Sequence, residues 1–169
     1  QPDYNRVWPG GDAPECAETA LMRDVIAAMR PRSPFASIDV HNNSGINPFY
    51  ACVTRIEPAF LRLATLFSRT TVFFSEPRGV QTQAFAELCP AVTVECGRPG
   101  EGDAHAAEFL DAVLHLAEFP RHALTHGDVD LFHTVATVKV PPDVSISFDG
   151  SPADLVFRAD LDHLNFCEL

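Results

Sequence analysis

The sequence predicts an α/β fold: a mixed, largely parallel sheet sandwiched by helices, followed by the start of a β-rich subdomain. Three observations support this prediction. Segments with helical and strand patterns alternate along residues 1–127, as in sheets covered by helices on both faces. Two of the strand-like segments end in charged side chains followed by a polar or glycine-rich loop, where such sheets bind ligands. Over residues 128–169, short β-rich runs separated by proline and glycine turns replace the helices.

The first predicted helix covers Pro14–Met29. Its apolar residues recur at helical spacing, acidic residues occupy its first turn, and Arg30 followed by a proline ends it. A short strand over residues 36–41 follows, and its apolar and polar side chains alternate. Residues 42–50 are rich in asparagine, glycine and proline, so we expect a loop there.

Four further elements are expected before residue 100. Residues 57–68 have a broad apolar face and predict a helix, and residues 70–75 predict a buried strand. A proline–glycine turn over residues 76–79 leads to a short helix over residues 82–88. Residues 91–96 alternate in polarity and predict a strand.

A last helix is expected over residues 103–118, with Asp103 as its N-cap. It contains two HxxE pairs, His105 with Glu108 and His115 with Glu118. Residues three apart on a helix can hold a metal ion together. The apolar stripe of this helix, however, places both pairs on its opposite, solvated face. We therefore interpret both pairs as surface residues. The predicted stripe comprises Ala106, Phe109, Leu110, Val113, Leu114 and Ala117.

Strand alternation predicts a shared site for two charged residues. Asp39 and His41 lie on one face of the first strand, because side chains alternate along a strand. Thr93 and Glu95 lie on one face of the strand over residues 91–96 for the same reason. We expect His41 and Glu95 at the same rim of the sheet. The alternative for His41 is a hydrogen-bonded residue that caps its strand.

The N-terminal segment offers a candidate anion-binding group. Residues 3–11 form a turn-rich loop that carries Asn5 and Arg6. The guanidinium of arginine is a fork of donors that suits a carboxylate, and an asparagine amide beside it adds another donor. The alternative interpretation is a surface arginine in a loop.

Composition limits the classes of partner and compartment. The chain has 169 residues, enough for one well-buried core. Its formal net charge of -11 disfavours nucleic acids and anionic membranes as partners, so an anionic substrate needs a local positive site. No apolar run is long enough for a membrane span. The 5 cysteines are scattered and form no CxxC pair, which indicates free thiols and a cytoplasmic location.

Three stretches, in this order, resemble one enzyme family. They are DYNRVWPGG (residues 3–11), SIDVHNNSG (37–45) and VTVECGRPGEG (92–102). Together they resemble the zinc-dependent succinylglutamate desuccinylase/aspartoacylase family, which is related to the zinc carboxypeptidases. The β-rich tail is similar to the second domain of that family. The resemblance implies a zinc carboxypeptidase-like catalytic α/β domain over residues 1–127 and the start of a C-terminal subdomain over residues 128–169.

The resemblance also implies a role for each matched residue. His41 would be one of three protein ligands of a catalytic Zn2+. Glu95 would be the general base that deprotonates the metal-bound water and later protonates the leaving amine. Asn5 and Arg6 would bind the substrate carboxylate. Asp39, on the same strand face as His41, would orient the imidazole; the alternative is a solvated strand residue.

The chain departs from the family pattern in two places. The family's HxxE motif, which supplies the other two zinc ligands, lies upstream of the Asn-Arg pair, and this sequence lacks it there. We therefore expect the sequence to be the later part of a longer protein. Aspartoacylases also carry a tyrosine and an arginine in the region that corresponds to residues 80–90, where this chain has neither. This disfavours N-acetylaspartate as the substrate, and Arg78 and Arg98 are interpreted as surface arginines.

The sequence thus predicts a zinc-dependent hydrolase that cleaves an amide bond next to a free carboxylate, in an N-acyl amino acid or at a peptide C-terminus. The alternative is a metal-free relative that binds a carboxylate ligand or a protein without chemistry. A serine or cysteine hydrolase is disfavoured, because Ser44 is outside any GxSxG elbow and no cysteine has neighbours that lower its pKa. Homo-oligomer formation stays open.

Overall fold

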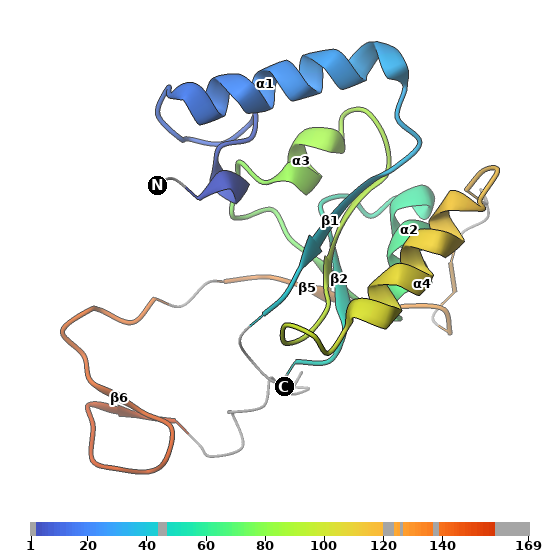
Figure 1. The fold of residues 1–169 in the computed structure, drawn as a ribbon. Coiled ribbons are helices and arrows are strands. Elements are labelled where there is room, and N and C mark those ends of the chain that lie inside the picture. Colours follow the sequence, from blue (N-terminus) through green and yellow to red (C-terminus); the bar gives the residue numbers. More distant parts are fainter. Residues whose placement is uncertain (1–2, 44–46, 120–123, 126, 137–138, 158–169) are drawn as a thin grey trace.

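The computed structural model describes residues 3–43, 47–119, 124–125, 127–136 and 139–157. Figure 1 shows a central sheet with helices on both faces and a small second sheet apart from it. Ser44 and Gly45 of the second motif, and Cys167, lie outside the described residues. The predicted α/β class with a mixed, largely parallel sheet is confirmed.

The central sheet has five strands. In spatial order they are β1 (Ser37–His41), β4 (Ala91–Glu95), β2 (Tyr50–Val53), β3 (Thr70–Phe73) and β5 (Asp130–His133). Strand β2 runs antiparallel to β4, and the other neighbouring pairs are parallel. The sequence predicts β1, β3 and β4 at their observed positions. It misses β2, because a short run of Tyr, Ala, Cys and Val shows no alternation between apolar and charged residues.

The helices divide between the two faces of the sheet (Figure 1). They are α1 (Ala17–Met29), α2 (Pro58–Phe67), α3 (Gln81–Phe85) and α4 (Asp103–Leu114), with 3-10 turns η1 (Tyr4–Arg6) and η2 (Arg30–Arg32). Helices α2 and α4 contact each other, and α2 also contacts β2 and β4. Helix α3 packs against β1 and β4. The first helix begins at Ala17 rather than at Pro14, because Cys16 is still extended, with φ of -152°.

The main core lies between the sheet and helices α2 and α4. Strand residues on the face toward α2 are fully buried, as Val94 and Val53 illustrate, each with 0% exposure. They pack against large apolar side chains of α2 and α4, with Leu63 and Phe109 among the most buried. Burial of this apolar area is the main stabilising term of the fold.

Helix α4 differs from its predicted form. It ends at Leu114, its N-cap is Gly102, and Asp103 lies in its first turn. Leu110 and Leu114, predicted to be buried, are 38% and 84% exposed. His105, predicted to be solvated, is half-buried, and its Nε2 lies 2.6 Å from the carbonyl oxygen of Phe67. The end of α2 offers that carbonyl and an aromatic neighbour, so tertiary contacts rotate α4 relative to the face expected from periodicity alone.

The sheet continues into the segment predicted as β-rich. Strand β5 lies beyond residue 127, yet it pairs with β3 of the central sheet. Strands β6 (Ile146–Ser147) and β7 (Leu155–Val156) form the separate two-stranded sheet. The division at residue 127 stays a prediction, and residues 137–138 and 158–169 of the predicted β-rich segment lie outside the described residues.

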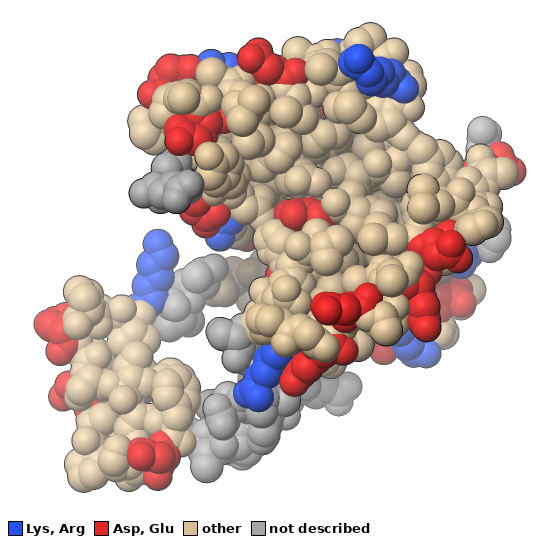
Figure 2. All heavy atoms as spheres, viewed as in Figure 1, with Lys and Arg blue, Asp and Glu red and all other residues tan. Residues whose placement is uncertain are grey.

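The surface is mostly acidic where it is charged. Figure 2 shows several groups of acidic side chains on a largely uncharged face and fewer basic ones, in line with the net charge of -11. Within the described part of the chain, no helix has the length and apolar character needed to cross a membrane.

One buried hydrogen bond ties α3 to the sheet and gives a stability prediction. The hydroxyl groups of Thr82 and Thr93 hydrogen-bond to each other, and both residues are buried. We expect Thr82→Val to lower the free energy of unfolding by about 1–3 kcal/mol, because it leaves the buried Thr93 hydroxyl without this partner. Urea denaturation measures the change. The double variant Thr82→Val/Thr93→Val is the control: it should be more stable than the sum of the two single changes predicts. Strict additivity would contradict the hydrogen bond.

Candidate active site

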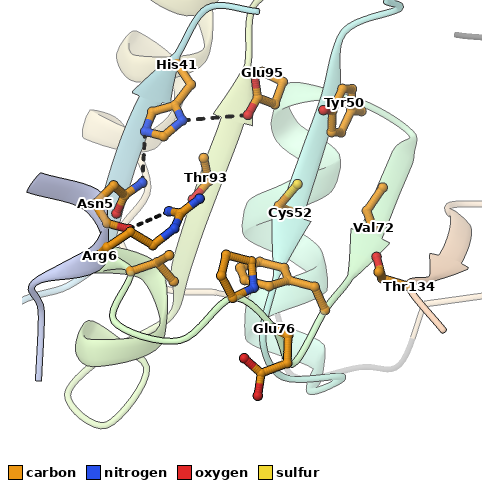
Figure 3. A pocket seen from close by; sticks show the side chains of 13 residues that line it. Asn5, Arg6, His41, Tyr50, Cys52, Val72, Glu76, Thr93, Glu95 and Thr134 are labelled. Carbon is orange, nitrogen blue, oxygen red and sulfur yellow. Dashed lines mark hydrogen bonds and ion pairs between the residues drawn. The ribbon is translucent and has the colours of Figure 1, made fainter. Parts of the chain in front are cut away.

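A cleft of about 380 Å³ lies over one face of the sheet and reaches the carboxyl ends of β1 and β4 (Figure 3). Carboxyl ends of strands are where α/β proteins bind ligands, and the volume of the cleft is in the range of small-molecule sites. We refer to it as the rim cleft. It is lined by Asn5, Arg6, His41, Tyr50, Cys52, Val72, Phe74, Glu76, Pro77, Val80, Thr93, Glu95 and Thr134.

Strand register brings the two charged residues predicted at the rim together. His41 pairs with Glu95 in register, and Glu95 pairs with Tyr50 on the other side. Paired residues project from the same face of a sheet, so the three side chains form one row across β1, β4 and β2. Figure 3 shows Glu95 between His41 and Tyr50. One row deeper, Asp39 pairs with Thr93.

The imidazole of His41 lies between two carboxylates. Its Nε2 is 3.0 Å from Oδ2 of Asp39, and its Nδ1 is 3.6 Å from Oε1 of Glu95. Hydrogen bonding to Asp39, and next to Glu95, raises the pKa of His41 from 6.5 to about 10, although partial burial opposes the shift. In the metal-free protein the two carboxylates therefore favour the protonated form of the ring, whose nitrogens face Asp39 and Glu95.

The titration of His41 can be tested directly. We expect Asp39→Asn to lower the pKa of His41 from about 10 toward 6.5, because the variant removes the hydrogen-bonded carboxylate that contributes most to the shift. An NMR titration of the ring protons measures the shift. The exposed Glu108 on α4 supplies the control variant Glu108→Gln, which should leave the pKa unchanged. An unaltered pKa in Asp39→Asn would contradict the proposed ion pair.

Stability should follow the same titration. The folded-state pKa is above the unfolded value, so the contribution of His41 is complete below pH 6.5 and is lost as pH rises through about 10. The free energy of unfolding of Asp39→Asn should therefore vary less with pH across this window than that of the unmodified protein.

Asn5 is held in place by its neighbours. Its Oδ1 accepts a hydrogen bond from the backbone N–H of Gln81 at 3.0 Å. Because a backbone N–H can only donate, this contact fixes the amide orientation and turns Nδ2 toward β1. Nδ2 donates to Oδ2 of Asp39 at 3.0 Å and lies 3.1 Å from Nε2 of His41. The side chain thus links η1, α3 and β1 beneath the imidazole.

Arg6 enters the rim cleft from η1, on the side of β1. Its side chain is 49% exposed and lies 4.0 Å from the carboxylate of Asp3, so the guanidinium stays accessible. The backbone of η1 is fixed by a close approach to Gly79. A Cβ at that position would lie 2.5 Å from the carbonyl oxygen of Arg6, and Gly79 has φ of +75°, which disfavours other residues.

Tyr50 and Cys52 of β2 complete the site, and the sequence did not predict them as site residues. Burial raises the pKa of the Cys52 thiol to about 12, with a further contribution from the charge of Glu95. Burial, and next the charge of Glu95, also raise the pKa of Tyr50. Both groups therefore stay protonated at neutral pH, and the Cys52 thiol is a poor nucleophile. Their alternation with the buried Ala51 and Val53 is a detectable signal, but only once β2 is recognised as a strand.

The structure brings together all five residues predicted for the site: His41, Glu95, Asn5 and Arg6 line the rim cleft, and Asp39 contacts His41. Their roles stay predictions. His41 would act as a metal ligand through Nδ1, because Asp39 holds Nε2, and the metal would take the place of the proton that faces Glu95. Among the described residues, however, no group of three His, Cys, Asp or Glu side chains could hold a metal ion. A catalytic zinc takes three protein ligands, so these residues do not by themselves complete a zinc site.

Comparison with known proteins identifies the fold. No family model matches the chain, and no curated protein matches it either. Among solved structures, a succinylglutamate desuccinylase from Vibrio parahaemolyticus superposes with a TM-score of 0.60 at 16% identity, over 89% of this chain and 51% of that one. The succinylglutamate desuccinylase from Chromobacterium violaceum gives 0.58 at 16% identity, over 85% and 54% of the two chains. An ectoine utilization protein from Ruegeria pomeroyi, in its apo form, gives 0.54 at 16% identity, over 79% and 47%.

These matches confirm the fold expected from the three motifs. The chain has the architecture of the desuccinylase structures and spans about half of their length, between 51% and 54%. Identity of 16% shows a common fold and leaves the reaction to be argued from the residues of the rim cleft.

Proposed function

We propose, from the fold shared with the succinylglutamate desuccinylase structures, that this protein hydrolyses an amide bond next to a free carboxylate. The substrate is an N-acyl amino acid or the C-terminus of a peptide. One observation carries the proposal: an exposed guanidinium, a carboxylate at a strand end and an imidazole line the same cleft, although they are far apart in the sequence. This set provides a group for the substrate carboxylate and a group for proton transfer.

Arg6 binds the substrate carboxylate in this proposal. Its guanidinium is the accessible positive group on the β1 side of the cleft, and charge-assisted pairs of this kind are the strongest hydrogen bonds that proteins use for carboxylates. Binding at Arg6 places the neighbouring amide near Glu95 and His41, which line the same cleft. Holding the amide there makes the attack of water effectively intramolecular.

Glu95 carries the proton. It accepts a proton from the attacking water while the hydroxide oxygen bonds to the amide carbon. The C–N bond then breaks, and Glu95 returns the proton to the leaving nitrogen, so the products are a carboxylic acid and a free amine. Proton transfer by a positioned side chain contributes about two to four orders of magnitude to the rate.

Asn5 and Asp39 position His41 in this proposal. The contacts of the Asn5 amide with Asp39 and Gln81 favour a positioning role over direct contact with the substrate. We propose His41 as one ligand of a zinc ion whose other ligands come from outside the described residues. A catalytic zinc lowers the pKa of a bound water and polarises a carbonyl group.

Hydrolysis of a mixed set of N-acyl amino acids tests the proposal. We expect release of free amines, loss of this activity after treatment with a chelator, and recovery after zinc is added back. Chromatography of the released amino acids measures turnover, and elemental analysis measures the metal. Absence of amine release with zinc present would overturn the hydrolase proposal.

A metal-free binding protein is the second candidate. One observation favours it: the described residues hold no group of three metal ligands. In that case the protein should bind N-acyl amino acids with an affinity that depends on Arg6, with no turnover and no bound zinc. Isothermal titration calorimetry measures the binding, and turnover in the zinc-loaded protein would exclude this candidate.

A further inference from the structure

The floor of the rim cleft changes in polarity from one side of the sheet to the other. The register aligns one residue from each strand in a single row across the face, from β1 to β5: Asp39, Thr93, Cys52, Val72 and Phe132. The row is polar on β1 and β4 and apolar on β2, β3 and β5. Figure 3 shows the same order, with Arg6 below His41 on one side and Val72 on the other.

The apolar half is open toward the cleft. Cys52, Val72 and Phe74 line the cleft and are half-buried, so apolar surface is left for a ligand to cover. Phe132, beside Val72 in register, is 36% exposed. Covering apolar surface of this kind favours binding by about 25 cal/mol per Å² removed from water.

The charges of the cleft favour a ligand with one carboxylate. Of the described residues that line it, Arg6 is the single arginine or lysine, whereas Glu95 and Glu76 are acidic. The imidazole of His41 is already paired with Asp39 and Glu95, so it adds no free positive charge. A second carboxylate on the ligand would lie in the apolar half, where the described part of the chain supplies no basic partner. Burial of an unpaired charge is strongly unfavourable, and the net charge of -11 adds repulsion.

Two arginines next to the cleft are already paired. A neighbouring hollow shares Phe74 and Glu76 with the rim cleft and is also lined by Arg55 and Arg78. Arg78 bonds to Glu76 at 3.1 Å, and Arg55 is paired with Glu87. Their charges are thus balanced by glutamates in the same hollow, so they provide no excess positive charge for a distal carboxylate.

We infer that the substrate is a monocarboxylate with an apolar acyl group. Its carboxylate lies at Arg6, its amide at His41 and Glu95, and its acyl chain against Cys52 and Val72. The inference rests on the proposed function for the orientation of the amide. It separates this protein from an enzyme for succinylated amino acids, because a succinyl group would place a second carboxylate on the apolar half.

A matched pair of acyl groups tests the inference. Butanoyl and succinyl groups have the same chain length, and a methyl group replaces the terminal carboxylate. Two pools are compared, the N-butanoyl and the N-succinyl derivatives of the same set of uncharged amino acids. We expect kcat/KM to be at least about a hundredfold higher for the butanoyl pool, as like charges placed side by side are strongly disfavoured. Equal or preferred hydrolysis of the succinyl pool would overturn the inference and leave the hydrolase proposal standing.

Binding provides a second readout that does not depend on turnover. Calorimetry with the Glu95→Gln protein should show tighter binding of the butanoyl pool than of the succinyl pool. If neither pool is hydrolysed but this preference is measured, the hydrolase proposal fails, whereas binding of an apolar acyl group in the apolar half of the cleft is supported. If neither pool binds, or the succinyl pool binds more tightly, the inference fails.

A variant that places a basic group in the apolar half tests the role of Val72. We expect Val72→Arg to reduce the preference for butanoyl over succinyl derivatives by at least about tenfold, because a succinyl carboxylate then has a partner. The control is Val156→Arg: Val156 lies on β7, outside the cleft, and is 49% exposed. Thermal denaturation verifies that both variants fold. An unchanged preference in folded Val72→Arg would overturn the placement of the acyl group.

Discussion

Replacing Glu95 by Gln is expected to lower kcat for N-acyl amino acid hydrolysis by about two to four orders of magnitude, which is the usual contribution of a positioned general base. Glutamine has nearly the same shape and keeps a hydrogen-bonding group at the end of β4. It cannot accept a proton from water or return one to the leaving nitrogen. Steady-state kinetics with a substrate pool measures the loss.

Two measurements separate this loss from a structural effect. The Glu95→Gln protein should still bind the substrate pool in calorimetry and should unfold cooperatively on heating. Glu108→Gln, an exposed change of the same kind on α4, should retain full activity. Activity near that of the unmodified protein in Glu95→Gln would remove Glu95 from the proposed mechanism.

Replacing Arg6 by Ala is expected to lower kcat/KM by about a hundredfold, chiefly through a higher KM. Hydrogen bonds to a charged group are worth about 1.5–3 kcal/mol, which corresponds to this loss. Arg6→Lys keeps the charge but loses the fork of donors, so we expect it to restore only part of the activity. The same kinetic assay measures both variants.

Changing the substrate tests whether Arg6 contacts the carboxylate. When the carboxylate of the substrate is replaced by a carboxamide, the unmodified protein should lose most of its kcat/KM, whereas Arg6→Ala should lose little more. Arg98→Ala changes an exposed arginine after β4 and is the control, with full activity expected. If Arg78→Ala or Arg98→Ala causes the larger loss, the carboxylate is bound elsewhere.

The sequence predicts the two strands that carry the central residues of the site. In β1 and β4, charged and apolar residues alternate, and this alternation fixes the face of each side chain. Since both strands end at the same level, His41 and Glu95 are expected at one rim, and the register pairs them directly. A pattern of a few neighbouring residues was sufficient to predict the face on which each side chain lies, because side chains alternate every two residues along a strand.

Other features depend on contacts that the local pattern does not contain. Strand β2 is a uniform apolar run, so its position between β4 and β3 and its reversed direction follow from the packing of the sheet. His105 is half-buried and not solvated as predicted, because it contacts the carbonyl oxygen of Phe67 and the ring of Phe49. The ring centroids of His105 and Phe49 are 5.0 Å apart. Both cases need residues distant in the sequence.

The sequence by itself therefore determined the α/β class, the strand faces and the residues that carry charge at the rim. Only the tertiary structure decided how these groups act on one another. The pKa of His41 rises to about 10 because β1 and β4 place two carboxylates beside one ring, and Asn5 is oriented by the backbone of Gln81. The apolar half of the cleft exists because β2 lies next to β4, and β3 next to β2. Electrostatic and packing energies depend on distances between side chains, and those distances are set by the assembled sheet.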